Sequence, residues 1–181
     1  MLDKMIGFIG AGNMGSAMIG GILDASLVTT SQIIASAHSP ETLDKIRTKF
    51  SIETTQSNEV VAERSDILFL AVKPNKFAEV LPQIKDHLKP DCIVVSIAAG
   101  QPISNIEAIL GKIKLVRAMP NTPALVGAAM SALCPNDKVT AEEVKLIESL
   151  FTSFGRAEVV PESMMDAVVG VPGSSLRWRG A

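Results

Sequence analysis

Tyrosine is absent from this chain of 181 residues, and histidine and cysteine occur only twice each. Without tyrosine, the chain cannot use the tyrosine acid on which one large class of short-chain dehydrogenases depends. Two histidines, His38 and His87, argue against a histidine-centred metal site. The cysteines, Cys92 and Cys134, lie far apart and outside any metal-ligand spacing, which suits a reducing compartment. We therefore expect a cytoplasmic protein that holds no metal.

The chain also lacks a large excess of charge of one sign and long apolar runs. The net charge is −2, so no basic field is available for nucleic acid or for an anionic membrane surface. No apolar run approaches the ~20 residues that a membrane helix needs. The opening MLDK leads at once into an apolar stretch, so we expect no signal peptide. Hydrophobic residues make up 47% of the chain, which fits strands that are buried on both faces.

The most informative feature is a glycine motif close to the N-terminus. Gly10, Gly12 and Gly15 have the spacing G-x-G-x-x-G, between an apolar stretch at 5–9 and a helical pattern over 14–23. In the order strand, turn, helix, this motif is typical of dinucleotide binding, because backbone N–H groups and the helix dipole then face a pyrophosphate. The alternative is that the glycines only join a strand to a helix.

Strand-like and helical patterns alternate through the rest of the chain. This alternation predicts an α/β fold, Rossmann-like, with a doubly wound and mostly parallel sheet. Between 120 and 135, proline and small residues predict a loop and an irregular strand. We expect further strands at 32–36, 52–55, 66–72, 92–98, 113–119 and 157–161, and further helices at 39–50, 57–65, 74–87, 102–110 and 140–154.

The turn after the second predicted strand bears on the choice of cofactor. NAD-binding domains usually have an acidic residue there, which holds the ribose 2′-hydroxyl. This turn reads Ser36-Ala37-His38-Ser39 and has no acid, so it would not repel a 2′-phosphate, and its serine hydroxyls could donate to one. We therefore expect NADP(H), with NAD(H) as the alternative. Equally open is the reading that these residues only cap a helix.

Two later strand ends are candidate sites because ligands bind beyond the carboxyl ends of strands in this fold. One reads Ala71-Val72-Lys73-Pro74, where Lys73 could reach a phosphate or a ribose. The other, over 96–100, has small residues that would let a flat ring approach. Alternatively, Lys73 is only a solvated lysine in a loop, and residues 96–100 only form a tight turn.

The chain resembles Δ1-pyrroline-5-carboxylate reductases over residues 5–171. The motifs that carry the resemblance are GFIGAGNMGSAMIGGIL, LFLAVKP, SIAAG, RAMPNTPALVGAAMSALCP and MMDAV, in this order. By this resemblance the pyrophosphate, the adenosine and the nicotinamide halves of the cofactor would be held by Ile9, Gly10, Ala11, Gly12, Asn13, Met14, Ser36, Asn58, Ala71, Val72, Lys73, Pro74, Ile97, Ala98, Ala99 and Asn121.

The resemblance also implies a reaction. It is hydride transfer to the C=N carbon of 1-pyrroline-5-carboxylate, the last step of proline synthesis. We expect a cofactor domain over 1–161, the start of a helical domain over 162–173, and an atypical tail over 174–181. In the family, the helical domain forms the homo-oligomer and binds the substrate carboxylate after the position of Gly173. No catalytic residue is therefore assigned, and we expect the activity of this chain to be impaired.

Two other functions stay open at the level of sequence. One is a cofactor-binding fragment that has no catalytic activity. The other is an enzyme like the β-hydroxyacid dehydrogenases, whose opening motif is similar. That family uses a lysine in a later glycine-containing helix, which this chain lacks.

Overall fold

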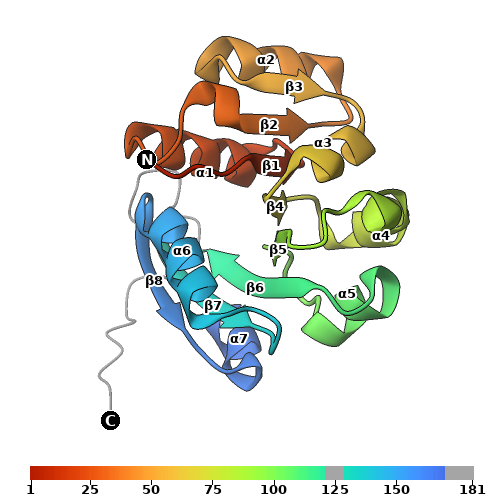
Figure 1. The fold of residues 1–181 in the computed structure, drawn as a ribbon, viewed down its shortest axis with the longest axis vertical. Helices are drawn as coiled ribbons and strands as arrows, with labels where there is room; N and C mark the ends of the chain where they lie inside the picture. The colour runs from red at the N-terminus through yellow and green to blue at the C-terminus, as the bar shows by residue number, and fades with distance from the viewer. Residues whose placement is uncertain (121–128, 170–181) are drawn as a thin grey trace.

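The computed structural model describes residues 1–120 and 129–169, which form an eight-stranded sheet covered by helices on both faces (Figure 1). The strands are β1 (Ile6–Ile9), β2 (Ile33–Ser36), β3 (Glu53–Thr55), β4 (Ile67–Leu70), β5 (Ile93–Ser96), β6 (Lys114–Pro120), β7 (Ala129–Pro135) and β8 (Gly155–Val159). The helices are α1 (Asn13–Asp24), α2 (Pro40–Phe50), α3 (Asn58–Arg64), α4 (Phe77–Ile84), α5 (Ile103–Leu110), α6 (Ala141–Thr152) and α7 (Glu162–Val169).

The strand order is β3-β2-β1-β4-β5-β6-β7-β8. The first six strands have the order of a dinucleotide-binding fold. Strands β2 and β3 lie on one side of β1, and the chain then crosses over so that β4, β5 and β6 lie on its other side. All neighbouring strands are parallel except β6 and β7, which pair antiparallel. The predicted Rossmann-like, mostly parallel fold is therefore confirmed.

The core consists of two main apolar layers, one on each face of the sheet. Side chains of α1 and α6 pack on one face, where Phe8 stacks on Phe69 with ring centroids 4.8 Å apart. Side chains of α3, α4 and α5 pack on the other face. Strands β1, β2, β4 and β5 are buried at every position, which explains their continuous apolar sequences.

The helix starts follow the expected capping chemistry. The Ser39 hydroxyl accepts a hydrogen bond from the Thr42 N–H, and Pro40 occupies the first turn of α2. Helix α6 begins with a capping box, in which Thr140 and Glu143 each accept a hydrogen bond from the other's backbone N–H.

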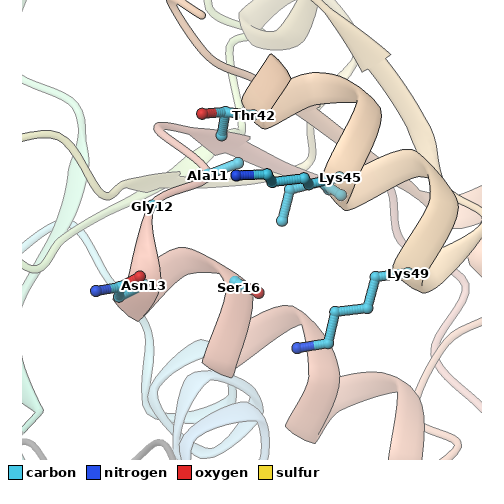
Figure 2. A pocket seen from close by; sticks show the side chains of 8 residues that line it. Ala11, Gly12, Asn13, Ser16, Thr42, Lys45 and Lys49 are labelled. Carbon is cyan, nitrogen blue, oxygen red and sulfur yellow. The ribbon is translucent and has the colours of Figure 1, made fainter. Parts of the chain in front are cut away.

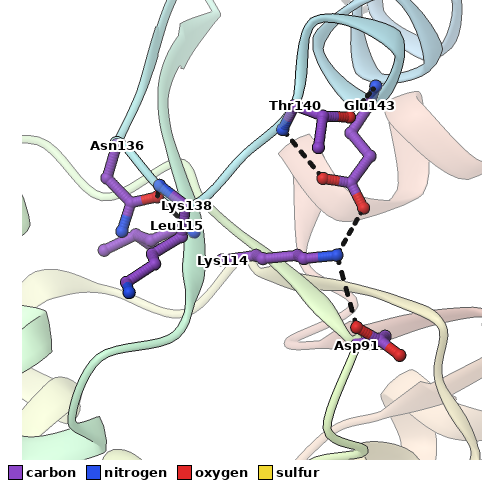
Figure 3. A network of polar contacts seen from close by, with 7 residues as sticks. All are labelled: Asp91, Lys114, Leu115, Asn136, Lys138, Thr140 and Glu143. Atoms are coloured by element: carbon purple, nitrogen blue, oxygen red, sulfur yellow. Dashed lines mark hydrogen bonds and ion pairs between the residues drawn. The ribbon is translucent and has the colours of Figure 1, made fainter.

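A polar network ties the amino ends of the central elements together (Figure 3). The Lys114 ammonium donates to Glu143 at 2.6 Å and to Asp91 at 3.4 Å. It thereby joins the start of β6 to the start of α6 and to the turn before β5. The network lies at the edge of the sheet opposite the carboxyl ends of β1, β4 and β5.

Three predicted elements differ from the structure. The helix expected over 74–87 is divided into a 3₁₀ turn (Pro74–Lys76), α4, and a second 3₁₀ turn (Lys85–His87). The stretch expected to be irregular contains β7, a regular seven-residue strand. Strand β8 begins two residues before the expected strand at 157–161 and ends at Val159.

Candidate cofactor site

The carboxyl ends of the central strands meet at one edge of the sheet. The Gly10 N–H donates to the Ser36 carbonyl at 3.0 Å, and the Ala71 N–H donates to the Ile9 carbonyl at 2.8 Å. The Ile97 N–H donates to the Leu70 carbonyl at 3.2 Å. These bonds extend the parallel ladder beyond the strands, so the turns after β1, β2, β4 and β5 lie side by side.

The three motif glycines meet different surroundings. Gly10 has a φ of +95°, and a Cβ there would lie 2.7 Å from the Ala71 carbonyl oxygen. At Gly15 a Cβ would lie 2.5 Å from the Gly10 oxygen. At Gly12 a Cβ would meet no described atom within 4 Å, and its φ of −72° suits any residue. Packing within the described chain therefore explains Gly10 and Gly15 but gives no reason for a glycine at position 12.

The start of α1 presents free backbone donors beside that open space. Its N-cap residue is Gly12, which supplies no side-chain hydrogen bond, and its first turn holds no acidic residue. First-turn N–H groups have no partner within a helix, and they carry the positive end of its dipole. The residues present therefore fit a bound pyrophosphate.

Two hollows adjoin this turn, one on each face of the sheet. The first, which we call the α3–α4 cavity, measures about 280 Å³ and is bordered by Gly10, Asn58 and Val72 from the predicted set. Its other lining residues are Ala37, His38, Gln56, Lys76, Glu79, Val80 and Gln83. Lys76 donates to Glu79 at 2.8 Å, and this hydrogen bond lowers the pKa of that carboxyl.

The second hollow, the α1–α2 cleft, lies between the start of α1 and one face of α2 and measures about 330 Å³ (Figure 2). Ala11, Gly12 and Asn13 of the predicted set line it. Its other lining residues are Ser16, Thr42, Lys45, Ile46 and Lys49. Together the two hollows are lined by the turns after β1, β2, β3 and β4 and by helices α1, α2, α3 and α4.

Ser36 ends strand β2, as expected, and its hydroxyl has a partner within the described chain. The side chain is fully buried, and its Oγ donates to Asn58 Oδ1 at 2.7 Å. The Asn58 amide in turn donates to Gln83 Oε1 at 2.8 Å. In this structure the Ser36 hydroxyl is thus engaged by Asn58, another residue of the predicted set, and contact of Ser36 with a 2′-phosphate stays a prediction.

The remaining predicted residues are distributed along the same edge. Lys73 and Pro74 are exposed at the start of the 3₁₀ turn after β4, whereas Ala98 is buried and Ala99 exposed after β5. Asn121 lies outside the described residues. Whether any of these residues touches a cofactor stays a prediction.

Sequence reasoning missed both the lysine face of α2 and the ion pair of a buried arginine. Thr42, Lys45 and Lys49 recur at helical spacing, a signal that was available in the sequence.

Arg117 is 1% exposed on β6 and pairs with Glu162 at 3.6 Å, and Glu162 also accepts a hydrogen bond from the Ile103 N–H. This pair fixes the start of α7 against β6 and α5.

Other chemistry has little support in the described part of the chain. Burial raises the pKa of Cys92 to about 12 and raises that of Cys134, so neither thiol is ionised near neutral pH. Within residues 1–120 and 129–169, no group of three histidine, cysteine or acidic residues could hold a metal ion. No helix in that part has the length and apolarity to cross a membrane.

Comparison with known proteins gives similarity over nearly the whole chain. A pyrroline-5-carboxylate reductase of Escherichia coli is 44% identical over 175 residues, which make up 96% of this chain and 65% of the relative. This chain thus spans slightly less than two thirds of that relative's length.

Solved structures agree with the curated relatives. A pyrroline-5-carboxylate reductase from Coxiella burnetii superposes with a TM-score of 0.88 and 32% identity, covering 93% of this chain and 63% of that one. A pyrroline carboxylate reductase from Plasmodium falciparum, solved with NADP bound, gives a TM-score of 0.84 and 32% identity over 93% of this chain and 62% of its own.

A family model covers the nucleotide-binding half of the chain. The model described as "NADP oxidoreductase coenzyme F420-dependent" matches residues 5–100, from β1 through the turn after β5. That span contains the glycine turn, both hollows and the strand ends around them. The chain therefore belongs to the NADP oxidoreductase, coenzyme F420-dependent family.

Proposed function

We propose that this chain carries the NADP(H)-binding part of a pyrroline-5-carboxylate reductase, which reduces 1-pyrroline-5-carboxylate to L-proline. The observation that carries the proposal is the 44% identity to the Escherichia coli reductase over 96% of the chain. The open space beside Gly12 and the uncapped start of α1 support it independently, because they suit a pyrophosphate.

The chain's own residues act in this reaction mainly by placement. The N–H groups at the start of α1 hold the pyrophosphate, and the residues at the ends of β4 and β5 border the nicotinamide. A nicotinamide cofactor supplies the hydride when bound. The small side chains of Ala71, Ala98 and Ala99 would let a flat ring lie close to the backbone. Correct placement of two reactants can lower a barrier by roughly 7–11 kcal/mol at the limit.

Two assays test the two halves of this proposal. Fluorescence titration of the chain with NADPH and NADH should give the tighter binding for NADPH, because no acid follows β2. Equal or reversed affinities would contradict the cofactor preference. Oxidation of NADPH that depends on 1-pyrroline-5-carboxylate tests the reaction itself.

A second candidate function is cofactor binding without turnover. It is favoured by the coverage, since the matched residues correspond to 65% of the Escherichia coli relative. Imine-dependent turnover at an ordinary enzyme rate, about ten per second, would exclude this candidate. Tight NADPH binding with no imine-dependent oxidation would support it. No observation on the described residues favours a β-hydroxyacid dehydrogenase.

The proposal includes a cytoplasmic location and a homo-oligomeric reductase. The location is supported by the two cysteines, which are both free and buried, as suits a reducing compartment. The oligomer is an expectation from the resemblance, and a molar mass from light scattering would test it. A strictly monomeric, active protein would contradict it.

A further inference from the structure

Strand β8 forms one edge of the sheet, and within the described residues it has no strand on its outer side. It pairs only with β7, in parallel register. The Val160 N–H, just past β8, donates to the Leu133 carbonyl of β7 at 2.9 Å. Because backbone groups alternate in direction along a strand, the even-numbered residues of β8 also turn theirs toward β7, and the odd-numbered residues turn theirs outward. The outer side of β8 therefore presents a row of backbone donors and acceptors.

The opposite edge of the sheet, formed by β3, is protected. Strand β3 has only three residues, its Glu53 pairs with Arg64, and the Thr54 hydroxyl accepts a hydrogen bond from Arg47. Strand β8 has five residues with no proline among them, and its Val159 is 47% exposed. Short strands, prolines and blocked edges are the usual means of preventing strand addition. Strand β8 lacks them and is suited to pairing with another strand.

The charges of β8 identify a second copy of this chain as the partner that fits. Arg156 and Glu158 are exposed, and they lie on the same face because they are two residues apart in one strand. Neither forms an ion pair within residues 1–120 and 129–169. If two β8 strands pair antiparallel about Ala157, Arg156 of each copy lies opposite Glu158 of the other. A two-fold axis thus makes both charge pairs attractive.

The direction of the backbone groups agrees with this register. Ala157 turns its N–H and C=O outward, so the two copies of Ala157 would exchange both hydrogen bonds. Positions 156 and 158 would then form the non-hydrogen-bonded pairs, in which the Cα atoms approach to about 4.5 Å and the side chains lie closest. Opposite charges in such pairs stabilise the pairing of strands, and like charges destabilise it. Val159 would lie opposite Gly155, which has no side chain to obstruct it.

We propose that two copies of this chain associate through antiparallel pairing of their β8 strands, which joins the two sheets into one continuous sheet. This inference goes beyond the proposed function and does not rest on it. The surface also differs from the helical domain, to which the family resemblance assigns the homo-oligomer. Five paired residues on each side make a small interface, so we expect weak association, with a Kd on the order of 10 μM.

Exchange of the charges at positions 156 and 158 tests the pairing. Sedimentation equilibrium of the chain from about 1 to 200 μM should show monomers and dimers in equilibrium. Arg156→Glu places glutamates opposite each other in both pairs, and Glu158→Arg does the same with arginines. Each variant should therefore weaken the dimer at least about tenfold. An equimolar mixture of the two variants should associate about as well as the wild type, because every pair then joins opposite charges.

Lys85→Glu is the matched control. It makes the same change of charge as Arg156→Glu, but Lys85 is exposed at the end of α4, a helix on the other side of the molecule from β8 (Figure 1). The dimer should weaken less than about twofold in this variant. Melting curves establish that the variants are folded. The double variant, Arg156→Glu with Glu158→Arg, restores opposite charges within one sequence and should dimerise like the wild type.

Four outcomes would overturn the inference. They are a chain that stays monomeric at every concentration, a dimer that neither single exchange weakens, an equal loss in Lys85→Glu, and single variants that do not associate when mixed. NADPH titration of the same samples keeps the proposed function separate, since strands β5, β6 and β7 lie between β8 and β4. Dimers that bind no NADPH would contradict the proposed function alone, and monomers that bind it would contradict the inference alone.

Discussion

At the residue scale, Gly7 and Gly12 belong to the same strand–turn–helix segment but stand in opposite surroundings. A Cβ on Gly7 would lie 1.9 Å from Ser65 Oγ and 2.7 Å from Val61 Cγ1, because α3 packs directly on β1. A Cβ on Gly12 would enter open space. Gly7 is therefore required by packing, whereas packing gives no reason for Gly12, and the proposed pyrophosphate would supply one.

Gly12→Val should abolish NADPH binding and leave the chain folded. The branched side chain would occupy the space proposed for the pyrophosphate, while its φ of −72° suits valine. The cost in stability should stay within about 1 kcal/mol, the range for a poorer N-cap residue. Titration and thermal melting on one sample measure both effects, and retained binding would mean that this glycine serves only the turn.

Gly7→Ala should show the reverse pattern. The added methyl group must displace the buried Ser65 hydroxyl, which donates to the Val61 carbonyl at 2.6 Å. Overpacking of this kind costs about 1–3 kcal/mol. Urea unfolding should record that loss, and the folded fraction should bind NADPH with unchanged affinity. An unchanged unfolding midpoint would show that α3 moves away from β1 at little cost.

The sequence could predict Gly12 but not the partners of Ser36. The glycine spacing is a local pattern with a direct physical reading, since all three positions lie on one turn. The Ser36 hydroxyl, in contrast, is engaged by Asn58, which lies 22 residues away and reaches it only because α3 packs beside β2. The lysine face of α2 was visible as a spacing, but its direction toward α1 required the packed structure.

At the scale of elements, α6 is held to the sheet by charge as well as by apolar packing. Its stripe of Ile147, Leu150 and Phe151 is buried against the core. At its first turn, Glu143 accepts from both Lys114 and the Thr140 N–H (Figure 3). Burial raises the pKa of Glu143, but these hydrogen bonds outweigh that effect and hold it below its ordinary value.

Glu143→Gln should remove a stabilisation that depends on pH. A carboxyl whose pKa is lowered by folding stabilises the chain above its unfolded pKa, which is about 4.3, and this contribution disappears as the pH falls through the lower folded value. Glutamine keeps the capping box but loses the charge that faces Lys114. The variant should be less stable by roughly 0.5–1 kcal/mol at pH 7, and nearly equal to the wild type below about pH 3.

Urea unfolding of both proteins across this pH range measures that difference. NADPH affinity should be unchanged at pH 7, since the network lies at the amino ends of β5 and β6 and the proposed site at the carboxyl ends of the strands. A difference in stability that does not vary with pH would assign the effect to packing instead of charge.

The elements that the sequence predicted correctly are those with local signals. Buried parallel strands read as continuous apolar runs, and the helices over 40–50 and 141–152 have caps that mark their starts. Strand β7 lacks such a signal, because it is regular only through its pairing with β6 on one side and β8 on the other. In α4, Pro82 removes one backbone donor and the helix ends two residues later in a 3₁₀ turn.

At the scale of the whole molecule, the proposed site is assembled from segments that are distant in the sequence. The turns after β1, β2, β4 and β5 meet at one edge only because the strand order reverses between β1 and β4. The alternation of strands and helices predicted the class of this sheet, because parallel neighbours need crossover connections, which are right-handed in nearly all proteins. The antiparallel β7 and the pairing of Arg117 with Glu162 depend on contacts that no local pattern encodes.

Because the proposed site spans these segments, a bound cofactor should stabilise the folded chain as a whole. A ligand that binds only the folded state at 100 times its Kd adds about 2.7 kcal/mol. For a chain of this size each kcal/mol raises Tm by roughly 2–4 °C, so saturating NADPH should raise Tm by about 5–10 °C. NADH at the same concentration should raise Tm less. Gly12→Val should show no shift with either cofactor and serves as the control for nonspecific effects. A Tm that does not respond to NADPH in the wild-type chain would contradict the assignment of this edge as the cofactor site.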